Sequence, residues 1–160
     1  MDQARIDEIL DGYGCEESSL LAILQDIQAE ANWLPRAALT RVAERVGVTL
    51  SHLYRLATFF EAFHLEPRGD HIWTVCMGTA CHVRGALLLQ EKLERDMAVD
   101  GRGNTSDMEH TVEAVNCVGA CALGPLVIVD GGYHGNMTSA KLDRVYKDFD
   151  ITPQVGAVEE

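Results

Sequence analysis

The sequence predicts an α/β protein in two parts, with a helical bundle over residues 1–65 and a mixed α/β domain over residues 66–151. Three observations lead to this prediction. Apolar residues recur at helical spacing through the first part, whereas the second part mixes short alternating runs with two helical stretches. A polar, turn-rich segment, Glu66–Asp70, separates the parts. Helices alone in the first part, and strands with helices in the second, together give the α/β class. Residues 152–160 are expected to form a flexible tail.

Four amphipathic helices are expected in the first part, each marked by residues that favour a helix end. Ser18 or Ser19 begins the second helix, and Pro35 fits the first turn of the third. Gly47 closes the third, and Ser51 caps a fourth that runs to about residue 64. In chain order, the apolar stripes are Ile6, Ile9 and Leu10; Leu20, Leu21, Ile23, Leu24, Ile27 and Ala31; Leu39, Val42, Ala43 and Val46; and Leu53, Leu56, Ala57 and Phe60.

The second part alternates strands and helices. Residues 71–75 and 111–115 are predicted strands, and residues 126–136 are a predicted hairpin around Asp130-Gly131-Gly132. A polar loop fills residues 100–110. The order β-α-β-β-β-α is typical of a small sandwich such as a thioredoxin-like domain. The two helices are expected to turn these residues inward: Val83, Ala86, Leu87 and Leu93 between residues 83 and 97, and Leu142, Val145 and Phe149 after a cap at Thr138 or Ser139.

Composition excludes several classes of protein. The 160 residues include 13 Lys and Arg against 25 Asp and Glu, for a net charge of −12. Such a chain repels phosphate backbones, so nucleic-acid binding is not expected. No apolar run approaches the ~20 residues that cross a bilayer, and the start lacks the pattern of a signal peptide. We therefore predict a cytoplasmic protein without direct membrane insertion.

Four of the five cysteines lie in two loops, each directly after a predicted strand. Cys76 and Cys81 form a C-x4-C pair, and Cys117 and Cys121 form a C-x3-C pair 35 residues further on. Loops at the same end of neighbouring strands bring four thiolates to one centre. Cys15 lies far from these pairs in the sequence and is expected to be an incidental thiol.

The spacing leaves three kinds of centre open: a [2Fe–2S] cluster, a zinc-binding module or a pair of redox-active dithiols. A C-x4-C opening lies at the edge of the zinc range and also begins the plant-type [2Fe–2S] pattern. Two separated pairs suit two irons, whereas a [4Fe–4S] site more often shows C-x2-C-x2-C. A Rieske centre needs two histidines, and only His82 stands beside a pair. Gly78 and Gly119 are expected to take positive φ and so to turn backbone N–H groups toward sulfur.

Two segments give the sequence a family resemblance. Residues 75–86, VCMGTACHVRGA, and 115–125, VNCVGACALGP, resemble the thioredoxin-like [2Fe–2S] subunit of NADH dehydrogenases, the 24 kDa subunit of respiratory complex I. LLAILQDIQAEANWLP, LYRLATFFEAFHLEP and DGGYHGNMT extend the resemblance over most of the chain. It implies a thioredoxin-like ferredoxin domain with one [2Fe–2S] cluster held by Cys76, Cys81, Cys117 and Cys121. Gly124, where the family pattern leads us to expect Ala, and the segment 106–110 depart from it.

The resemblance also implies a function. The residues of both cysteine segments are most similar to the corresponding sequence of the small subunits of soluble NAD-linked and electron-bifurcating hydrogenases. It implies an electron-transfer subunit without catalytic residues of its own, next to a flavoprotein subunit that carries FMN and binds NAD(H). Further iron–sulfur and catalytic subunits would complete the complex. A respiratory complex I or an NAD-dependent formate dehydrogenase is the alternative parent.

Two features of the first part suggest other interpretations. A helix-turn-helix pattern can be read in the segment LTRVAERVGVTLSHLYRLATFF. A DNA-binding iron–sulfur regulator is therefore the alternative function from a class other than electron-transfer subunits. Three arginines and three glutamates balance one another over residues 41–66, which counts against that reading. The bundle also carries many aromatics for its size: Trp33, Tyr54, Phe59, Phe60 and Phe63. They either complete the bundle and its contact with the second domain or form part of a docking face. The family resemblance favours docking onto the flavoprotein.

Overall fold

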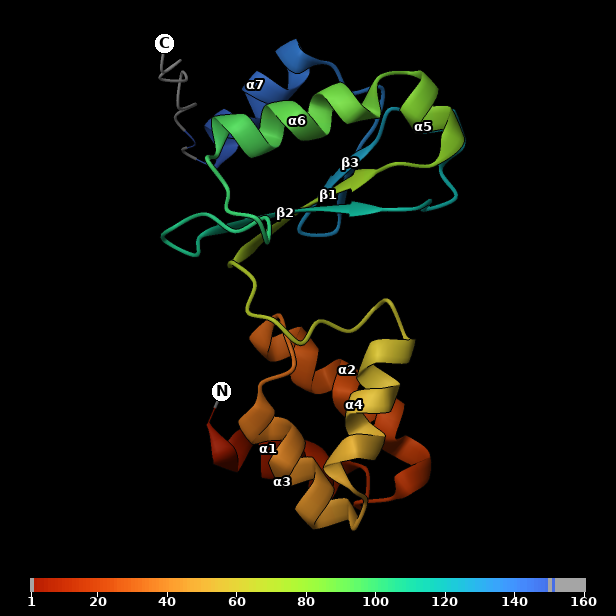
Figure 1. Cartoon of the computed structure of the whole chain (residues 1–160), viewed down its shortest axis with the longest axis vertical. Helices are drawn as coiled ribbons and strands as arrows, with labels where there is room; N and C mark the ends of the chain where they lie inside the picture. The colour runs from red at the N-terminus through yellow and green to blue at the C-terminus, as the bar shows by residue number, and fades with distance from the viewer. Residues whose placement is uncertain (1, 150, 152–160) are drawn as a thin grey trace. The chain divides into compact units, whose positions relative to one another are not determined.

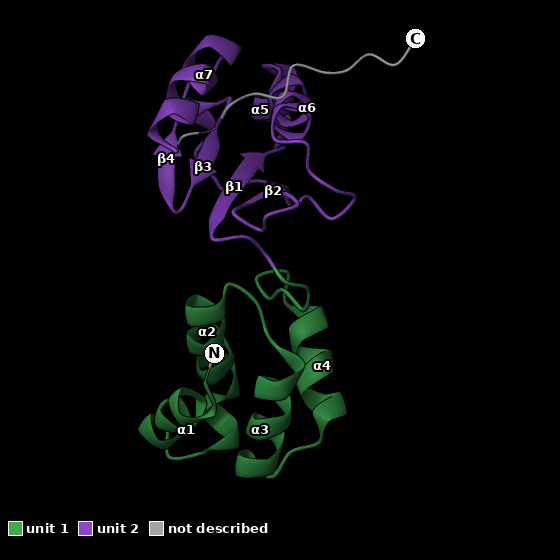
Figure 2. Cartoon of the chain, turned by 90° about the vertical axis from the view of Figure 1, so that its left-hand side faces the viewer, with its two compact units in different colours: residues 1–67 green, residues 68–160 purple. Residues whose placement is uncertain are grey.

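The computed structural model describes residues 2–149 and 151. The chain divides into two compact units, Met1–Pro67 and Arg68–Glu160, each with a hydrophobic core of its own (Figure 2). The predicted division after residue 65 stays a prediction, and the predicted tail lies outside the described residues. No helix in the described part of the chain is long and apolar enough to span a membrane.

The first unit is a bundle of four α-helices, which Figure 1 shows packed against one another. They are α1 (Gln3–Gly12), α2 (Leu20–Ala31), α3 (Arg36–Val46) and α4 (Leu50–Phe59), with a 3-10 turn, η1 (Glu17–Ser19), before α2. Their apolar stripes meet in one core because each repeats at helical spacing. The largest fully buried side chains of this core are Leu10, Ile23, Leu24, Ile27, Leu34, Leu39 and Leu53.

The helix ends of this unit match those predicted from the sequence in part. Gly47 ends α3 with φ +82°, a conformation that glycine adopts without strain. Thr49, and not Ser51, caps α4: its Oγ1 accepts a hydrogen bond from the His52 N–H at 3.2 Å. Helix α4 ends at Phe59 rather than near residue 64, because Phe60 is extended.

The start of the bundle differs in smaller ways. Ser19 precedes α2 but makes no capping bond with its side chain, since the turn η1 already leads into the helix. Pro35 stands at the capping position of α3, one residue before the helix begins. Leu21 is 39% exposed and lies off the buried stripe.

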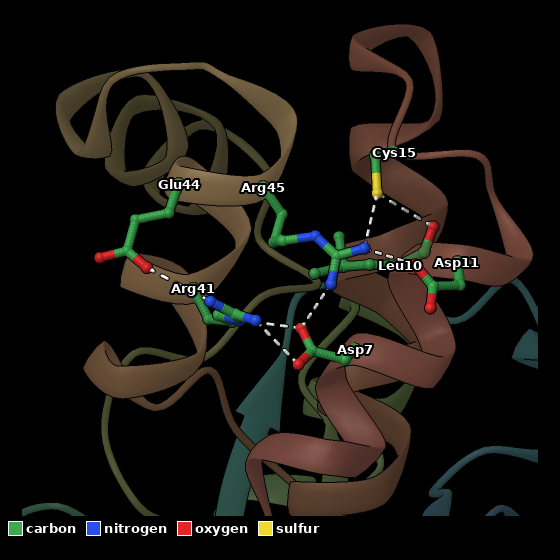
Figure 3. Close-up of polar contacts among 7 residues, drawn as sticks. All are labelled: Asp7, Leu10, Asp11, Cys15, Arg41, Glu44 and Arg45. Atoms are coloured by element: carbon green, nitrogen blue, oxygen red, sulfur yellow. Dashed lines mark hydrogen bonds and ion pairs between the residues drawn. The ribbon is translucent and has the colours of Figure 1, made fainter.

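A polar network joins α1 to α3 (Figure 3). Arg41 donates two hydrogen bonds to the Asp7 carboxylate, at 2.8 and 2.9 Å, and Arg45 donates a third at 2.9 Å. Arg45 also pairs with Asp11, and its Nη2 lies 3.5 Å from the Cys15 Sγ. The charged group in contact with Cys15 is therefore an arginine, although its sequence neighbours are acidic.

The second unit is built on a four-stranded sheet. The strands β1 (His71–Cys76), β2 (His110–Val115), β3 (Val127–Val129) and β4 (Gly132–His134) lie in the order β2-β1-β3-β4. Strands β1 and β2 are parallel, and β3 is antiparallel to both β1 and β4. The expected hairpin is present, with Asp130 and Gly131 at its turn.

Helices α6 (Ala86–Asp96) and α7 (Ser139–Asp148) cover one face of this sheet (Figures 1 and 2). Between sheet and helices lie the fully buried Trp73, Leu93, Leu142 and Tyr146. Thr138 caps α7, as expected, by accepting a hydrogen bond from the Lys141 N–H. The unit is thus a two-layer α/β sandwich.

The helix expected over residues 83–97 begins only at Ala86, because Val83 ends a separate helix that the sequence patterns do not predict. A short helix, α5 (Thr79–Val83), comes first, and Gly85 with φ +97° separates it from α6. The left-handed residue turns the chain, so the apolar stripe begins anew after the break. Val83 is 80% exposed and Leu87 is also exposed, while Ala86 and Leu89 are buried.

Residues just after the unit boundary pair with β2 and the loop before it. Gly69 N–H donates to Thr111 Oγ1 at 2.6 Å, and Arg68 forms an ion pair with Glu113 at 3.1 Å. A Cβ on Gly69 would lie 2.8 Å from the His110 backbone, so this close approach needs glycine. The polar segment that the sequence marks as a linker is therefore partly built into the sheet domain.

Candidate iron–sulfur site

The first cysteine loop connects β1 to α5. Cys76 is the last residue of the strand, and Cys81 lies in the middle of the single-turn helix. The His82 N–H donates to the Gly78 carbonyl at 2.9 Å, which closes the turn between them. Both cysteines are buried, each 2% exposed.

The second cysteine loop follows β2. The parallel register places Cys76 opposite Val115, so both loops leave the sheet at the same edge. Gly119 turns this loop with φ +81°, and Cys121 begins the 3-10 turn η2 (Cys121–Leu123). Cys117 and Cys121 are exposed. The site therefore has a buried half and an exposed half.

The four sulfur atoms approach one another. The side chain of Cys76 interacts with those of Cys81 and Cys117, and Cys117 interacts with Cys121. Burial and then Cys76 raise the pKa of the Cys81 thiol, and the neighbouring Cys117 raises that of Cys121. Several thiolates at one point repel each other, so a bound cationic centre favours their deprotonation. The structure thus brings together all four predicted ligands; their role as ligands stays a prediction.

Backbone groups point at these sulfurs. Burial alone would raise the pKa of the Cys76 thiol, but hydrogen bonds outweigh it and leave the pKa lowered: first those from the backbone of Val118 and Gly78, then those from the side chains of Cys81 and Cys117. The Gly119 N–H donates to the Cys117 Sγ at 3.4 Å. Such donors stabilise negative charge on sulfur. These contacts agree with the expectation that Gly78 and Gly119 turn N–H groups toward sulfur. Only Gly119 does so from a positive φ, +81°, whereas the φ of Gly78 is −55°.

Two glycines leave space around the sulfurs. A Cβ on Gly78 would lie 3.0 Å from the Cys117 Sγ, and a Cβ on Gly124 would lie 3.0 Å from the Cys81 Sγ. Gly124, a departure from the family pattern in the sequence, therefore borders the ligand set directly. Both glycines therefore lie against predicted ligands, where a side chain would press on the sulfur.

A [2Fe–2S] cluster and a single metal ion make different demands on such loops. Among the described residues, no group of three or more His, Cys, Asp or Glu surrounds a point that would hold one ion. A two-iron cluster does not need such a point, because each iron takes two thiolates. Two cysteine pairs, one in each loop, match this division of ligands between two irons.

The exposed half of the site opens into a hollow of about 770 Å³. Cys117 and Cys121 line it together with Val83 and Arg84, which lie where α5 ends. The sequence patterns do not single out Arg84 as a site residue. Its position three residues after Cys81, directly before a glycine, is the signal in the sequence that could have found it.

Comparisons with known proteins agree with this geometry. The model of the thioredoxin-like [2Fe–2S] ferredoxin family matches residues 6–150. An NADH-quinone oxidoreductase subunit of Rhizobium meliloti (strain 1021) is 33% identical over 147 residues, which are 92% of this chain and 88% of that protein. NADP-reducing hydrogenase subunit HndA of Solidesulfovibrio fructosivorans is 30% identical over 134 residues, 84% of this chain and 78% of that one.

A solved structure shares the fold. A chain of an NAD+-reducing [NiFe]-hydrogenase in the air-oxidised state superimposes with a TM-score of 0.72 and 19% identity, over 82% of this chain and 23% of that chain. The family match covers nearly the whole sequence and confirms both the resemblance and the fold class predicted from the residues. The chain therefore belongs to the thioredoxin-like [2Fe–2S] ferredoxin family.

Proposed function

We propose that this chain is the [2Fe–2S] electron-transfer subunit of a multisubunit, NADH-dependent oxidoreductase. The observation that supports this most directly is the convergence of four cysteine side chains where β1 and β2 end, two of them buried and two exposed. A buried pair fixes a cofactor in the protein, and an exposed pair leaves it within reach of a partner. The family match supplies the identity of that cofactor.

The ligands are Cys76, Cys81, Cys117 and Cys121. The bound cluster supplies one-electron chemistry, and the chain supplies position and electrostatics. Cys76 and Cys81 anchor it from the β1–α5 loop, while Cys117 and Cys121 complete it from the loop after β2. The N–H groups of Gly119 and Val118 place positive dipole ends beside the sulfurs.

The partner is a flavoprotein subunit that carries FMN and binds NAD(H), with further iron–sulfur and catalytic subunits beyond it. A soluble hydrogenase or a bifurcating enzyme is the favoured parent complex, supported by the similarity to the hydrogenase subunit HndA. Respiratory complex I is supported by the similarity to the Rhizobium meliloti NADH-quinone oxidoreductase subunit, and an NAD-dependent formate dehydrogenase is a further alternative. Free thiols that bind a cluster need a reducing compartment, which supports the cytoplasm.

The helical unit supplies a candidate docking face. Of the five aromatics from which the sequence predicts this face, Phe63 is buried in the bundle, whereas Phe59 is 79% exposed and Phe60 is 37% exposed. The Phe59 and Phe60 rings pack edge to face at 5.0 Å, which presents a rigid apolar surface at the end of α4. Aromatic side chains of this kind are enriched at the centres of interfaces.

Phe59→Ser tests this docking face in the full chain. We expect the variant to keep the [2Fe–2S] spectrum and to lose co-purification with the NADH-oxidising flavoprotein of its complex. Leu21→Ser, at an exposed position of α2, is the matched control and should retain the partner. Unchanged co-purification of Phe59→Ser would move the interface to the cluster domain. Absence of NADH-driven reduction in the wild-type complex would contradict the proposed function itself.

A further inference from the structure

Arg84 occupies a specific place beside the cysteine loops. It follows the last residue of α5, and the left-handed Gly85 after it begins the turn into α6. Its Nη1 donates hydrogen bonds to two backbone carbonyls, those of Cys121 at 3.2 Å and Gly124 at 3.0 Å. Both carbonyls belong to the turn that presents Cys121. One guanidinium nitrogen thus ties the first cysteine loop to the second.

Arg84 also lies close to a predicted ligand. The Cβ position on Gly124 is 3.0 Å from the Cys81 Sγ and 3.5 Å from the Arg84 Nη1, so these two atoms are at most about 6.5 Å apart. Because Gly124 has no side chain, no methyl group stands at that point between the cation and the sulfur. An alanine there would press on both.

The charge of Arg84 is not neutralised by a carboxylate. Within the described residues its hydrogen bonds go to carbonyl oxygens, and it forms no ion pair. Arg41, Arg45 and Arg68, by contrast, each pair with a carboxylate. In a chain of net charge −12, an uncompensated cation beside four thiolates stabilises added negative charge more than a neutral residue would.

We propose that Arg84 is a positioning residue of the electron-transfer site, which holds the Cys121 turn in place and raises the reduction potential of the cluster through its positive charge. The inference rests on the proposed function, because it takes Cys76, Cys81, Cys117 and Cys121 as the ligands. The two roles are separable: the hold needs a donor that spans two carbonyls, and the potential needs only the charge. Lysine retains the charge on a flexible stem but lacks the planar guanidinium that fixes the position of Nη1, and glutamine retains a donor without the charge.

The test compares Arg84→Gln and Arg84→Lys in the full chain by redox titration, with iron and sulfide measured on every sample. Arg84→Gln should lower the midpoint potential by the order of a tenfold change in the oxidised-to-reduced ratio, which is about 59 mV for one electron. Arg84→Lys should keep the wild-type midpoint. Both should lose iron to a chelator faster than wild type. Arg144→Gln, which removes a positive charge from an exposed position of α7, is the matched control and should change neither.

The outcomes separate this inference from the proposed function. An Arg84→Gln variant with a full complement of iron and sulfide, and with the same midpoint potential as Arg144→Gln, would overturn the role of Arg84. It would leave the proposed electron-transfer function intact. If Arg84→Gln does not bind the cluster but Arg84→Lys does, the site needs the positive charge. If neither loads while Arg144→Gln does, Arg84 only fastens the loop, and its role in the potential is wrong. A wild-type chain without a [2Fe–2S] cluster would overturn both proposals.

Discussion

Gly78 approaches Cys117 so closely that a Cβ on Gly78 would lie 3.0 Å from the Cys117 Sγ. The same Cβ would lie 3.1 Å from the Asn116 carbonyl oxygen. The φ of Gly78 is −55°, which any residue adopts, so space and not backbone strain demands glycine here. The contact links the two cysteine loops directly.

Gly78→Ala should therefore displace Cys117 and weaken the cluster without unfolding the chain. We expect purified Gly78→Ala to contain less iron than wild type and to lose it faster to a chelator, with an unchanged far-ultraviolet circular dichroism spectrum. Gly101→Ala is the control, because a Cβ on Gly101 meets nothing within 4 Å. Equal iron retention in the two variants would show that the loops adjust to the added methyl group.

The potential of the cluster should be low. Four thiolates and a net charge of −12 oppose the addition of an electron, which favours the plant-type range near −400 mV over the Rieske range. The N–H of Gly119, 3.4 Å from the Cys117 Sγ, and the positive charge of Arg84 act in the opposite direction. Redox titration followed by electron paramagnetic resonance measures the balance. A midpoint above zero would mean that the donors dominate or that the cofactor is different.

His110 should make the stability of the second unit dependent on pH. It is 7% exposed, and the Trp73 Nε1–H donates to its Nδ1 at 3.3 Å, which requires a neutral ring. Burial, and then the stacked His71, lower its pKa in the folded state. The unfolded chain therefore binds the proton more readily, so stability is full above the unfolded pKa of about 6.5 and falls as the pH drops below it.

His110→Gln should flatten that dependence. We expect the loss of thermal stability between pH 8 and pH 5.5 to be smaller in His110→Gln than in wild type, because glutamine does not titrate. His134→Gln, on β4, serves as the control and should keep the wild-type slope. A slope in His110→Gln equal to that of the control would assign the pH dependence to other groups.

The cap of α4 gives a stability test within the first unit. Thr49 Oγ1 accepts the His52 N–H, whereas Ser51 lies inside the helix with an exposed side chain. Thr49→Ala should lower the free energy of unfolding of that unit by about 1 kcal/mol, and Ser51→Ala should cost much less. Urea unfolding, monitored by circular dichroism, measures both. A larger loss in Ser51→Ala would restore the cap that the sequence suggested.

Much of this architecture follows from the sequence because its signals are local. Helical spacing places the buried stripes of α2 and α3, and Gly47 marks a helix end through its own backbone freedom. Alternation and the Asp130-Gly131 turn predict the β3–β4 hairpin. The cysteine spacing and the family resemblance of the two cysteine segments predict the site residues, which the structure brings together.

The errors arise where the deciding interaction is not visible in the local pattern. Thr49 and Ser51 are both good capping residues, and only the path of the chain decides between them. The break at Gly85 interrupts what reads as one helical stripe, so the prediction that Val83 is buried is wrong, and the residue is exposed. The two contacts of Arg84 span about 40 residues of sequence, beyond any local motif.

The most direct test of the central claim is the metal content of the anaerobically purified chain, measured with the four ligand variants and Cys15→Ala. The account predicts about two irons and two sulfides per wild-type chain and a one-electron paramagnetic signal after reduction with dithionite. Replacing Cys76, Cys81, Cys117 or Cys121 by alanine should abolish or destabilise the cluster, and Cys15→Ala should retain it. One zinc per chain without visible absorbance, or loss of colour in Cys15→Ala alone, would contradict the account.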